Sequence, residues 1–329
     1  MNTIDSLPAS YDQSVRRLPL LLIALAAAAA QPFFYGGQAV IEGVLMRGPR
    51  GWAVAARRPD GGISMRQEEL RSRMYRSPFF RLPLVRGVVG LAEMLHLGTS
   101  AMIWSANVKA KAENMEIGRG AIAVTLAFSM VFSFAIFFGL PLLLGNALQR
   151  HSTLGFTLVE GAIRGAFVLG YMYLISFIPD VRRLFQYHGA EHKTINAYES
   201  GAPLTVAGVA PQSRLHPRCG TGFLIVVVFV SIVVFSVVGR PALPVLSLSR
   251  LVLIPVVAAI SYELIRLGAR HSGNPVVARL MIPVLGAQLL TTREPDDSMM
   301  EVALAAFLAV REEPGGAGAR RPAIEEIVV

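Results

Sequence analysis

The stretch GTGFLIVVVFVSIVVFSVV, from Gly220 to Val238, carries no charged residue along its whole length. Because the hydrocarbon core of a bilayer is about 30 Å thick, a helix needs about 20 apolar residues to cross it. Within lipid, an α-helix satisfies all of its backbone hydrogen bonds internally. This stretch therefore predicts a membrane-spanning helix, and it decides the fold class.

Three further stretches are long and apolar enough to span a membrane. Gly120 to Leu148 carries no charge, whereas Leu154 to Ile178 carries only Glu160 and Arg164, four positions apart and so on one helix face. The last, Val245 to Leu267, has charged residues only near its two ends. We therefore predict an α-helical integral membrane protein with about four transmembrane helices.

The composition agrees with a membrane protein. Of the 329 residues, 53% are apolar and 16% are charged, against about 25% charged in ordinary soluble domains. The single cysteine, Cys219, excludes an internal disulfide framework. A net charge of +9 fits nucleic acid or anionic lipid, and in a membrane protein we expect anionic lipid as the partner.

The basic residues also predict the orientation. Between Gly36 and Arg119 there are 13 Lys and Arg against 7 Asp and Glu, whereas the short connections between spans hold only Arg150 and Arg240. The segment between the second and third spans holds five basic residues, namely Arg182, Arg183, Lys193, Arg214 and Arg218. Because Lys and Arg accumulate on the cytoplasmic side, both termini and residues 179–219 are expected in the cytoplasm.

The remaining segments are less apolar. In residues 1–34, an apolar run after Arg16 and Arg17 resembles a signal peptide, and we favour a short non-spanning helix or a start-site extension. In residues 35–119, QAVIEGVLMR, WAVAARRP and GISMRQEEL predict a small antiparallel sheet, followed by a long interfacial helix from Pro83. We expect two pairs of spans in residues 120–178 and 220–267, with a cytosolic loop between them in residues 179–219. After the last span we expect a cytosolic helical region, residues 268–310, and a disordered tail, residues 311–329.

The cytosolic segment contains YHGAEHKTINAYE, from Tyr187 to Glu199. On a helix, His188 and His192 project from one face, and Glu199 returns to the same stripe because eleven residues make almost three turns. HGAEH matches the H-x-x-E-H pattern of inverted zinc peptidases, in which the glutamate, here Glu191, is the general base. The alternative is a surface helix whose histidines hydrogen-bond to backbone or to lipid phosphate.

A second candidate group, HPRCGTG from His216 to Gly222, stands at the entrance to the third span. A thiolate with imidazoles suits zinc better than magnesium or calcium. His188 and His192 with either Glu199 or Cys219 would leave an open position, as in a catalytic site. If His216 and Cys219 both bind, the site is closed and structural.

Other polar residues have weaker signals. Four arginines flank the site and are candidates for binding a phosphorylated headgroup or a carboxylate: Arg182, Arg183, Arg214 and Arg218. The glycines of YGGQAVIEGVLMRGP form neither G-x-G-x-x-G nor a P-loop, so no nucleotide cofactor is expected.

The segments GGQAVIEGVLMRGP, YHGAEHKTINAYE, HPRCGTGF, SYELIR and LLTTREP together resemble, in this order, the bacterial YqhQ family. The resemblance runs from about Tyr35 to about Phe307. It implies a multi-pass inner-membrane protein. The family is defined by a domain of unknown function, and its members are described as predicted metal-dependent enzymes. By position it implies a metal site of His188, Glu191, His192, His216 and Cys219. Glu42, Glu263, Arg266 and Glu294 fall in the other motifs without an assigned role. Asn196 and Gly222 stand where other members often have histidine and serine.

Two functions follow as expectations. The first is a membrane-embedded zinc hydrolase that acts at the cytosolic face on a lipid-linked or peptide substrate, with Glu191 activating water. The second is a non-catalytic scaffold with a structural metal site, which assembles membrane proteins or docks a complex such as the ribosome. Transport is a weaker third, motivated by Glu160, Arg164, Arg250 and Glu263 within spans. The sequence leaves the oligomeric state open.

Overall fold

The computed structural model describes residues 35–70, 78–112, 118–149, 152–271, 273–311 and 327–328. The expectations for residues 1–34 and for residues 312–326 of the tail lie outside this range. The fold described below belongs to Tyr35–Val329.

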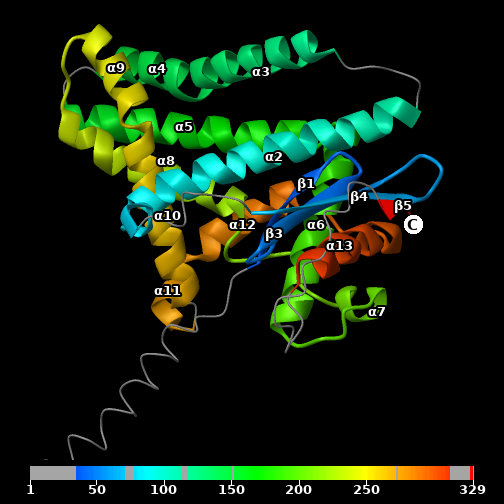
Figure 1. The fold of residues 1–329 in the computed structure, drawn as a ribbon. Helices are drawn as coiled ribbons and strands as arrows, with labels where there is room; N and C mark the ends of the chain where they lie inside the picture. The colour runs from blue at the N-terminus through cyan, green and yellow to red at the C-terminus, as the bar shows by residue number, and fades with distance from the viewer. Residues whose placement is uncertain are drawn as a thin grey trace, which may run out of the picture. The chain divides into compact units, whose positions relative to one another are not determined.

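The expected antiparallel sheet is present near the N-terminal end of the described chain (Figure 1). Its strands pair in sequence order, and the last strand comes from the tail that we expected to be disordered. They are β1 (Gly36–Val40), β2 (Gly43–Arg47), β3 (Gly51–Arg57), β4 (Ile63–Glu69) and β5 (Ile327–Val328). QAVIEGVLMR supplies two strands, because Ile41 and Glu42 make a tight turn in which Glu42 has a φ of 55°. A positive φ of this kind suits the turn of a two-residue hairpin.

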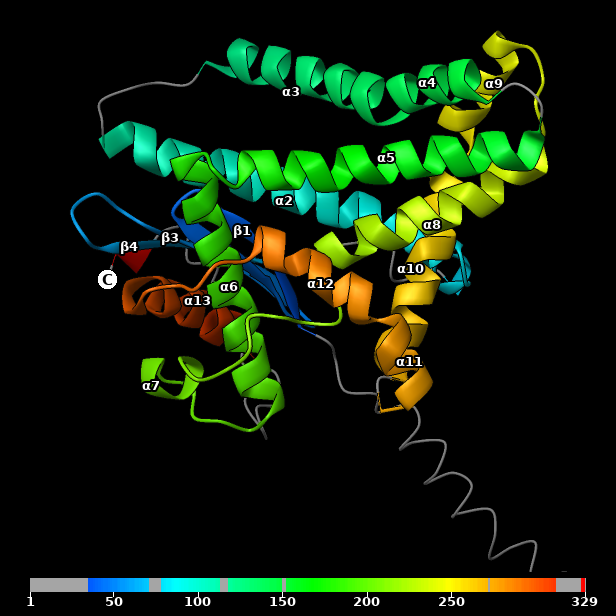
Figure 2. The ribbon, with the colours of Figure 1, turned by 180° about the vertical axis from the view of Figure 1, so that it is seen from behind.

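Helices cover both faces of the sheet, which explains why its strands are apolar on both sides. The long helix α2 (Val85–Ala112) places Leu97 and Ala101 against Leu45 and Val54 on one face. On the other face, the core contains residues of α6 (Pro179–Glu199) and α13 (Asp297–Val310). The sheet is therefore the middle layer between α2 and the pair α6 and α13 (Figures 1 and 2).

The expectation of a loop between the second and third apolar helices needs correction. Residues 179–219 were predicted as a loop, yet more than half of them lie in α6 and the short helix α7 (Val206–Val209). The region from 268 to 310 was predicted to be helical, and its last helix, α13, contributes Val302, Ala306 and Phe307 to the core of the sheet. These side chains share one stripe of α13 and are fully buried there.

The apolar stretches form the predicted helices. Among the described residues, three helical stretches are long and apolar enough to cross a membrane, namely Gly120–Leu148, Thr153–Ile175 and Gly220–Val238. There are up to four if a pair bent by 43° counts as one span. The helices are α3 (Arg119–Phe134), α4 (Leu140–Leu148), α5 (Thr153–Ile175), α8 (Gly220–Val238), α9 (Leu243–Val252), α10 (Ile254–Arg270), α11 (Pro275–Leu280) and α12 (Ile282–Thr291). The bent pair is α9 and α10, and the bend lies next to Pro255, which has no N–H to continue the helix.

Three buried charged residues within these helices pair with one another. Glu160 of α5 accepts hydrogen bonds from Arg164 and from Arg250 of α9, and all three side chains are almost completely buried. Arg164 also donates through Nε to the carbonyl oxygen of Phe137 at 3.0 Å. That carbonyl lies in a π-helical turn, Ala135–Gly139, and is four residues before Pro141, which lacks the N–H that would otherwise bond to it.

Candidate metal centre

Helix α6 carries the first half of the site and is held against the rest of the fold at a glycine. The helix begins at Pro179, a residue that suits the first turn, and ends at Glu199. A Cβ placed on Gly189 would lie 2.1 Å from the carbonyl oxygen of Arg293. The backbone after α12 therefore approaches α6 at a distance that only glycine allows.

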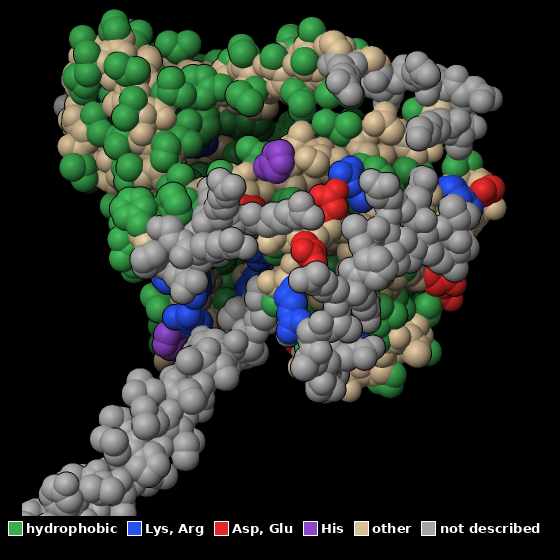
Figure 3. All heavy atoms as spheres, viewed as in Figure 1, with side chains coloured by type: hydrophobic (Ala, Val, Ile, Leu, Met, Phe, Trp, Pro, Cys, Tyr) green, Lys and Arg blue, Asp and Glu red, His purple; other side chains and the backbone are tan. Residues whose placement is uncertain are grey.

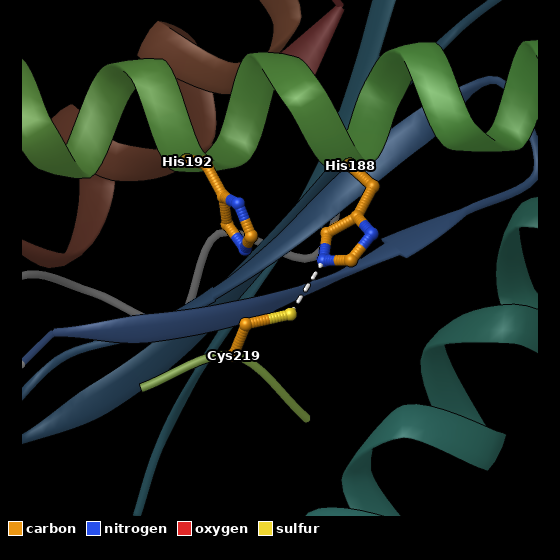
Figure 4. Close-up of side chains that lie close together, drawn as sticks. All are labelled: His188, His192 and Cys219. Carbon is orange, nitrogen blue, oxygen red and sulfur yellow. Dashed lines mark hydrogen bonds between the residues drawn. The ribbon is translucent and has the colours of Figure 1, made fainter. Parts of the chain in front are cut away.

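Three potential ligand atoms converge next to this contact (Figure 4). One atom each of His188, His192 and Cys219 lies within 4.8 Å of the others. The Sγ of Cys219 is 3.2 Å from Nε2 of His188. Cys219 is the residue that precedes α8, and its Sγ also accepts a hydrogen bond from the N–H of Thr221. The residue just before a candidate membrane span is thus brought onto the histidine face of α6.

Backbone carbonyls orient both imidazole rings. Nδ1 of His188 lies 2.8 Å from the carbonyl oxygen of Thr291, and Nδ1 of His192 lies 2.6 Å from that of Arg214. Since a carbonyl oxygen only accepts, Nδ1 is the protonated nitrogen in each ring. In the neutral rings Nε2 then keeps its lone pair, which is the tautomer that a metal-binding histidine needs.

The three donors fit zinc in type and spacing. Two imidazoles and one thiolate belong to the ligand set that zinc takes. Zn–N bonds of about 2.0 Å and Zn–S bonds of about 2.3 Å at tetrahedral angles place ligand atoms about 3.5 Å apart. The observed separations are at most 4.8 Å, so small side-chain rotations would be enough to close the set around one ion.

Glu191 lies beside these ligands but is not one of the three. Its side chain is buried, packs against Gly37 of β1 and accepts a hydrogen bond from the Gly37 N–H. Its Oε2 is buried and has no hydrogen-bond partner among the described residues. Burial raises the pKa of Glu191 to about 7, although the neighbouring His188 and the Gly37 N–H act in the opposite direction.

This pKa predicts how the stability of the metal-free protein depends on pH. The pKa is about 7 in the folded state against 4.5 for an ordinary glutamate. Between these values the folded state holds a proton that the unfolded state has lost, so the free energy of unfolding falls as the pH rises. From about pH 5 to pH 7 we expect a loss of about 2 kcal/mol. In chelator-treated protein, Glu191→Gln should remove most of this slope, and parallel pH profiles of the two proteins would contradict the assignment.

His216 and Glu199, the other predicted ligands, pair with each other next to the site. Nε2 of His216 lies 3.5 Å from Oε2 of Glu199 and 3.3 Å from Nη2 of Arg218, which is itself ion-paired with Glu199. The rings of His192 and His216 are 5.7 Å apart between centroids. Burial lowers the pKa of His216 despite its hydrogen bond to Glu199. Among the described residues, the group that could hold an ion is therefore His188, His192 and Cys219.

Helix α12 and the segment after it support the site, a role that the sequence did not reveal. The amide of Gln288 accepts from the backbone N–H of His216 at 2.9 Å and donates to its carbonyl at 2.8 Å. The hydroxyl groups of Thr221 and Thr291 are 2.9 Å apart. LLTTREP was recognised as a motif, but it contacts His188 through the backbone carbonyl of Thr291. Every residue type has such a carbonyl, so the sequence could not reveal this contact.

Of the four flanking arginines, Arg183 and Arg218 form ion pairs through their side chains. Arg183 donates to Glu42 at 2.6 Å, and the hydroxyl of Tyr187 lies 3.3 Å from the other oxygen of Glu42. Arg182 is exposed, whereas Arg214 supplies the carbonyl that orients His192.

Two further motif residues make ion pairs away from the three ligands. Glu294 pairs with the buried Lys193, and Glu263 pairs with Arg86 at 2.5 Å. Glu42, Glu263 and Glu294, which had no assigned role, therefore each tie two segments of the fold together.

The chain has relatives whose function is open. A model of the family described as "Protein of unknown function (DUF1385)" matches residues 82–313, which include the whole candidate site. The chain is also similar to a protein of Bacillus subtilis (strain 168) described as "Uncharacterized protein YqhQ". The identity is 34% over 291 residues, which are 84% of this chain and 92% of that protein. No solved structure matches the chain. The family resemblance predicted from the motifs is thereby confirmed.

Proposed function

Because the chain belongs to this family of proteins of unknown function (DUF1385), we propose its activity from the site alone. It is a membrane-embedded, zinc-dependent hydrolase of the bacterial cytoplasmic membrane that acts at the cytosolic face. The observation that carries this proposal is the convergence of His188, His192 and Cys219, three ligands of a type that zinc takes. Three protein ligands leave a fourth position for water, which is the arrangement of catalytic zinc sites.

Each residue has a distinct task in this proposal. His188, His192 and Cys219 hold the ion, and the carbonyls of Thr291 and Arg214 keep the two rings in the binding tautomer. The ion supplies Lewis acidity, which lowers the pKa of a bound water to about 7. Glu191 is the general base, because a carboxyl with a pKa near neutrality accepts and returns a proton at cytosolic pH. Its unpartnered Oε2 is the atom available for that proton.

The surroundings favour a substrate that is held at the membrane surface. Cys219 caps the N-terminus of α8, a candidate span, so the site lies where that span begins. Of the three ligands only His188 is half-buried, so a substrate would reach the site from the side of His188. The exposed guanidinium of Arg182 is available for an anionic group. A lipid-linked or a peptide substrate fits these features.

Metal analysis of detergent-purified protein tests the proposal. We expect about one zinc ion per chain in the wild type and in His96→Ala, an exposed histidine on α2 that serves as the matched control. His188→Ala, His192→Ala and Cys219→Ala should each lose the ion. The proposal would be wrong if no preparation, including one reloaded after chelation, contained a transition metal.

A structural metal site in a scaffold, docking a ribosome or another membrane complex, is the second candidate, and the position of His216 favours it. This ring is buried next to that of His192, and as a fourth ligand it would close the site.

Two variants distinguish the open site from the closed one. Zinc that is retained in His216→Ala supports the open site. Glu191→Gln, with zinc bound, should lower the hydrolysis of a chromogenic ester at least about a hundred-fold if Glu191 is the base. Equal rates in both proteins would favour the scaffold.

A further inference from the structure

The end of α10, α11 and the start of α12 form a helical tip with one sign of charge. From Leu264 to Thr292 the sequence contains Arg266, Arg270 and Arg279 and no acidic residue. The tip folds back on itself, because a Cβ on Gly268 would lie 3.1 Å from the sulfur of Met281. Two of the arginines flank Gly268 and the third precedes Met281 by two positions, so the fold gathers their charges in one region.

The nearest acid does not neutralise these charges. Glu263 accepts from Nε of Arg86 at 2.7 Å and from its Nη2 at 2.5 Å, and it also accepts from the N–H of Leu84. Arg266 attracts this carboxylate only at longer range. Within the described part of the chain, Arg266, Arg270 and Arg279 make no ion pair, so their charges remain available to a partner.

Exposed apolar side chains accompany the arginines. Leu267 is 54% exposed, Val276 63%, Leu280 69% and Ile282 62%. Figure 3 shows basic and histidine side chains together with hydrophobic ones over this part of the molecule, and in Figures 1 and 2 α11 lies at the edge of the described fold. Large apolar side chains interleaved with arginines are typical of helices that lie in the headgroup region of a bilayer. There the apolar groups enter the acyl boundary and the guanidinium groups contact phosphates.

We propose that this tip, from Leu264 to Ile282, is a binding surface for the headgroups of anionic phospholipids. Arg266, Arg270 and Arg279 bind the phosphates, and Leu267, Val276, Leu280 and Ile282 enter the lipid beside them. The partner is an anionic bilayer rather than nucleic acid, because exposed leucines and an isoleucine would be costly on a polar nucleic-acid surface. The surface does not depend on the metal centre and stands even if the proposed hydrolase does not.

The experiment uses the full chain in nanodiscs of phosphatidylcholine alone and of equimolar phosphatidylcholine and phosphatidylglycerol. The midpoint of thermal unfolding should be higher in the anionic discs, and added salt should reduce this difference. Arg266→Gln, Arg270→Gln and Arg279→Gln combined should abolish the difference and leave the midpoint in phosphatidylcholine unchanged. In the triple variant, the retention of spin-labelled phosphatidylglycerol should fall roughly a hundred-fold, because each arginine near an anionic surface contributes about a factor of five.

A matched variant separates this surface from net charge. Arg58→Gln with Arg66→Gln removes one arginine of the turn between β3 and β4 and one of β4, which pair with Asp60 and Glu68. This variant should keep the stabilisation by phosphatidylglycerol. The proposal is overturned if the triple variant keeps the full stabilisation. It is also overturned if that variant loses as much stability in phosphatidylcholine as in the anionic discs, since the arginines would then serve the fold.

Discussion

Glu160→Ala is expected to lower the free energy of unfolding by about 3 to 5 kcal/mol, the usual cost of removing one partner from a buried ion pair. One oxygen of Glu160 accepts from Arg164 at 2.5 Å and from Arg250 at 3.0 Å, and the other accepts from Arg250 at 2.6 Å. Without the carboxylate, two guanidinium groups face each other among the rings of Phe235 and Phe156. The yield of monodisperse protein after detergent extraction and the midpoint of thermal unfolding measure this loss.

Replacing the whole cluster distinguishes pairing from other roles. Glu160→Leu, Arg164→Met and Arg250→Met combined should recover most of the stability, because buried ion networks are often replaced by apolar side chains without loss. A triple variant as unstable as Glu160→Ala would show that the charges do more than neutralise one another. Wild-type stability of Glu160→Ala itself would show that the carboxylate is not needed there.

The long apolar helices and the sheet were predictable because each follows from one local pattern. An uncharged run such as Gly220–Val238 has no alternative to a helix within lipid, and alternating strands separated by tight turns pair with their sequence neighbours. The breaks within two of the apolar helical stretches were not predicted, although Pro141 and Pro255 lie next to them. The position of α13 was also missed. Its contact with the sheet joins segments some 250 residues apart, and no local pattern contains that information.

The site was predictable in the part that lies on one helix. His188 and His192 share a face of α6 because they are four residues apart, but the meeting with Cys219 depends on the tertiary fold. The same periodicity placed Glu199 on their stripe. Glu199 is however the last residue of α6, where its side chain extends toward Arg218 and His216. The helical period predicted which face of α6 carries Glu199. The partner of its carboxylate is instead set by the charged side chains that lie near the end of the helix.

Gly189→Ala is expected to destabilise the protein by about 3 kcal/mol, at the upper end of the usual cost of overpacking. The new Cβ would lie 2.1 Å from the carbonyl oxygen of Arg293, and neither backbone yields as a flexible side chain would. Moving the two segments apart breaks the 2.9 Å hydrogen bond from Arg293 N–H to Phe185 and the 2.8 Å bond from His188 to Thr291. Thermal unfolding measures the first effect. The loss of the bond that orients His188 should also weaken zinc binding about 10- to 100-fold.

Gly286→Ala is the matched control for this substitution. Gly286 is an exposed glycine of α12, and a Cβ there would meet nothing within 4 Å. Alanine favours a helix over glycine by up to about 1 kcal/mol, so this variant should be as stable as the wild type or more stable and should bind zinc equally. Wild-type stability together with wild-type zinc binding in Gly189→Ala would mean that α6 and the segment after α12 are not in close contact. His188 would then have to be oriented by a group other than the Thr291 carbonyl, and the proposed centre would lose the support that links it to LLTTREP.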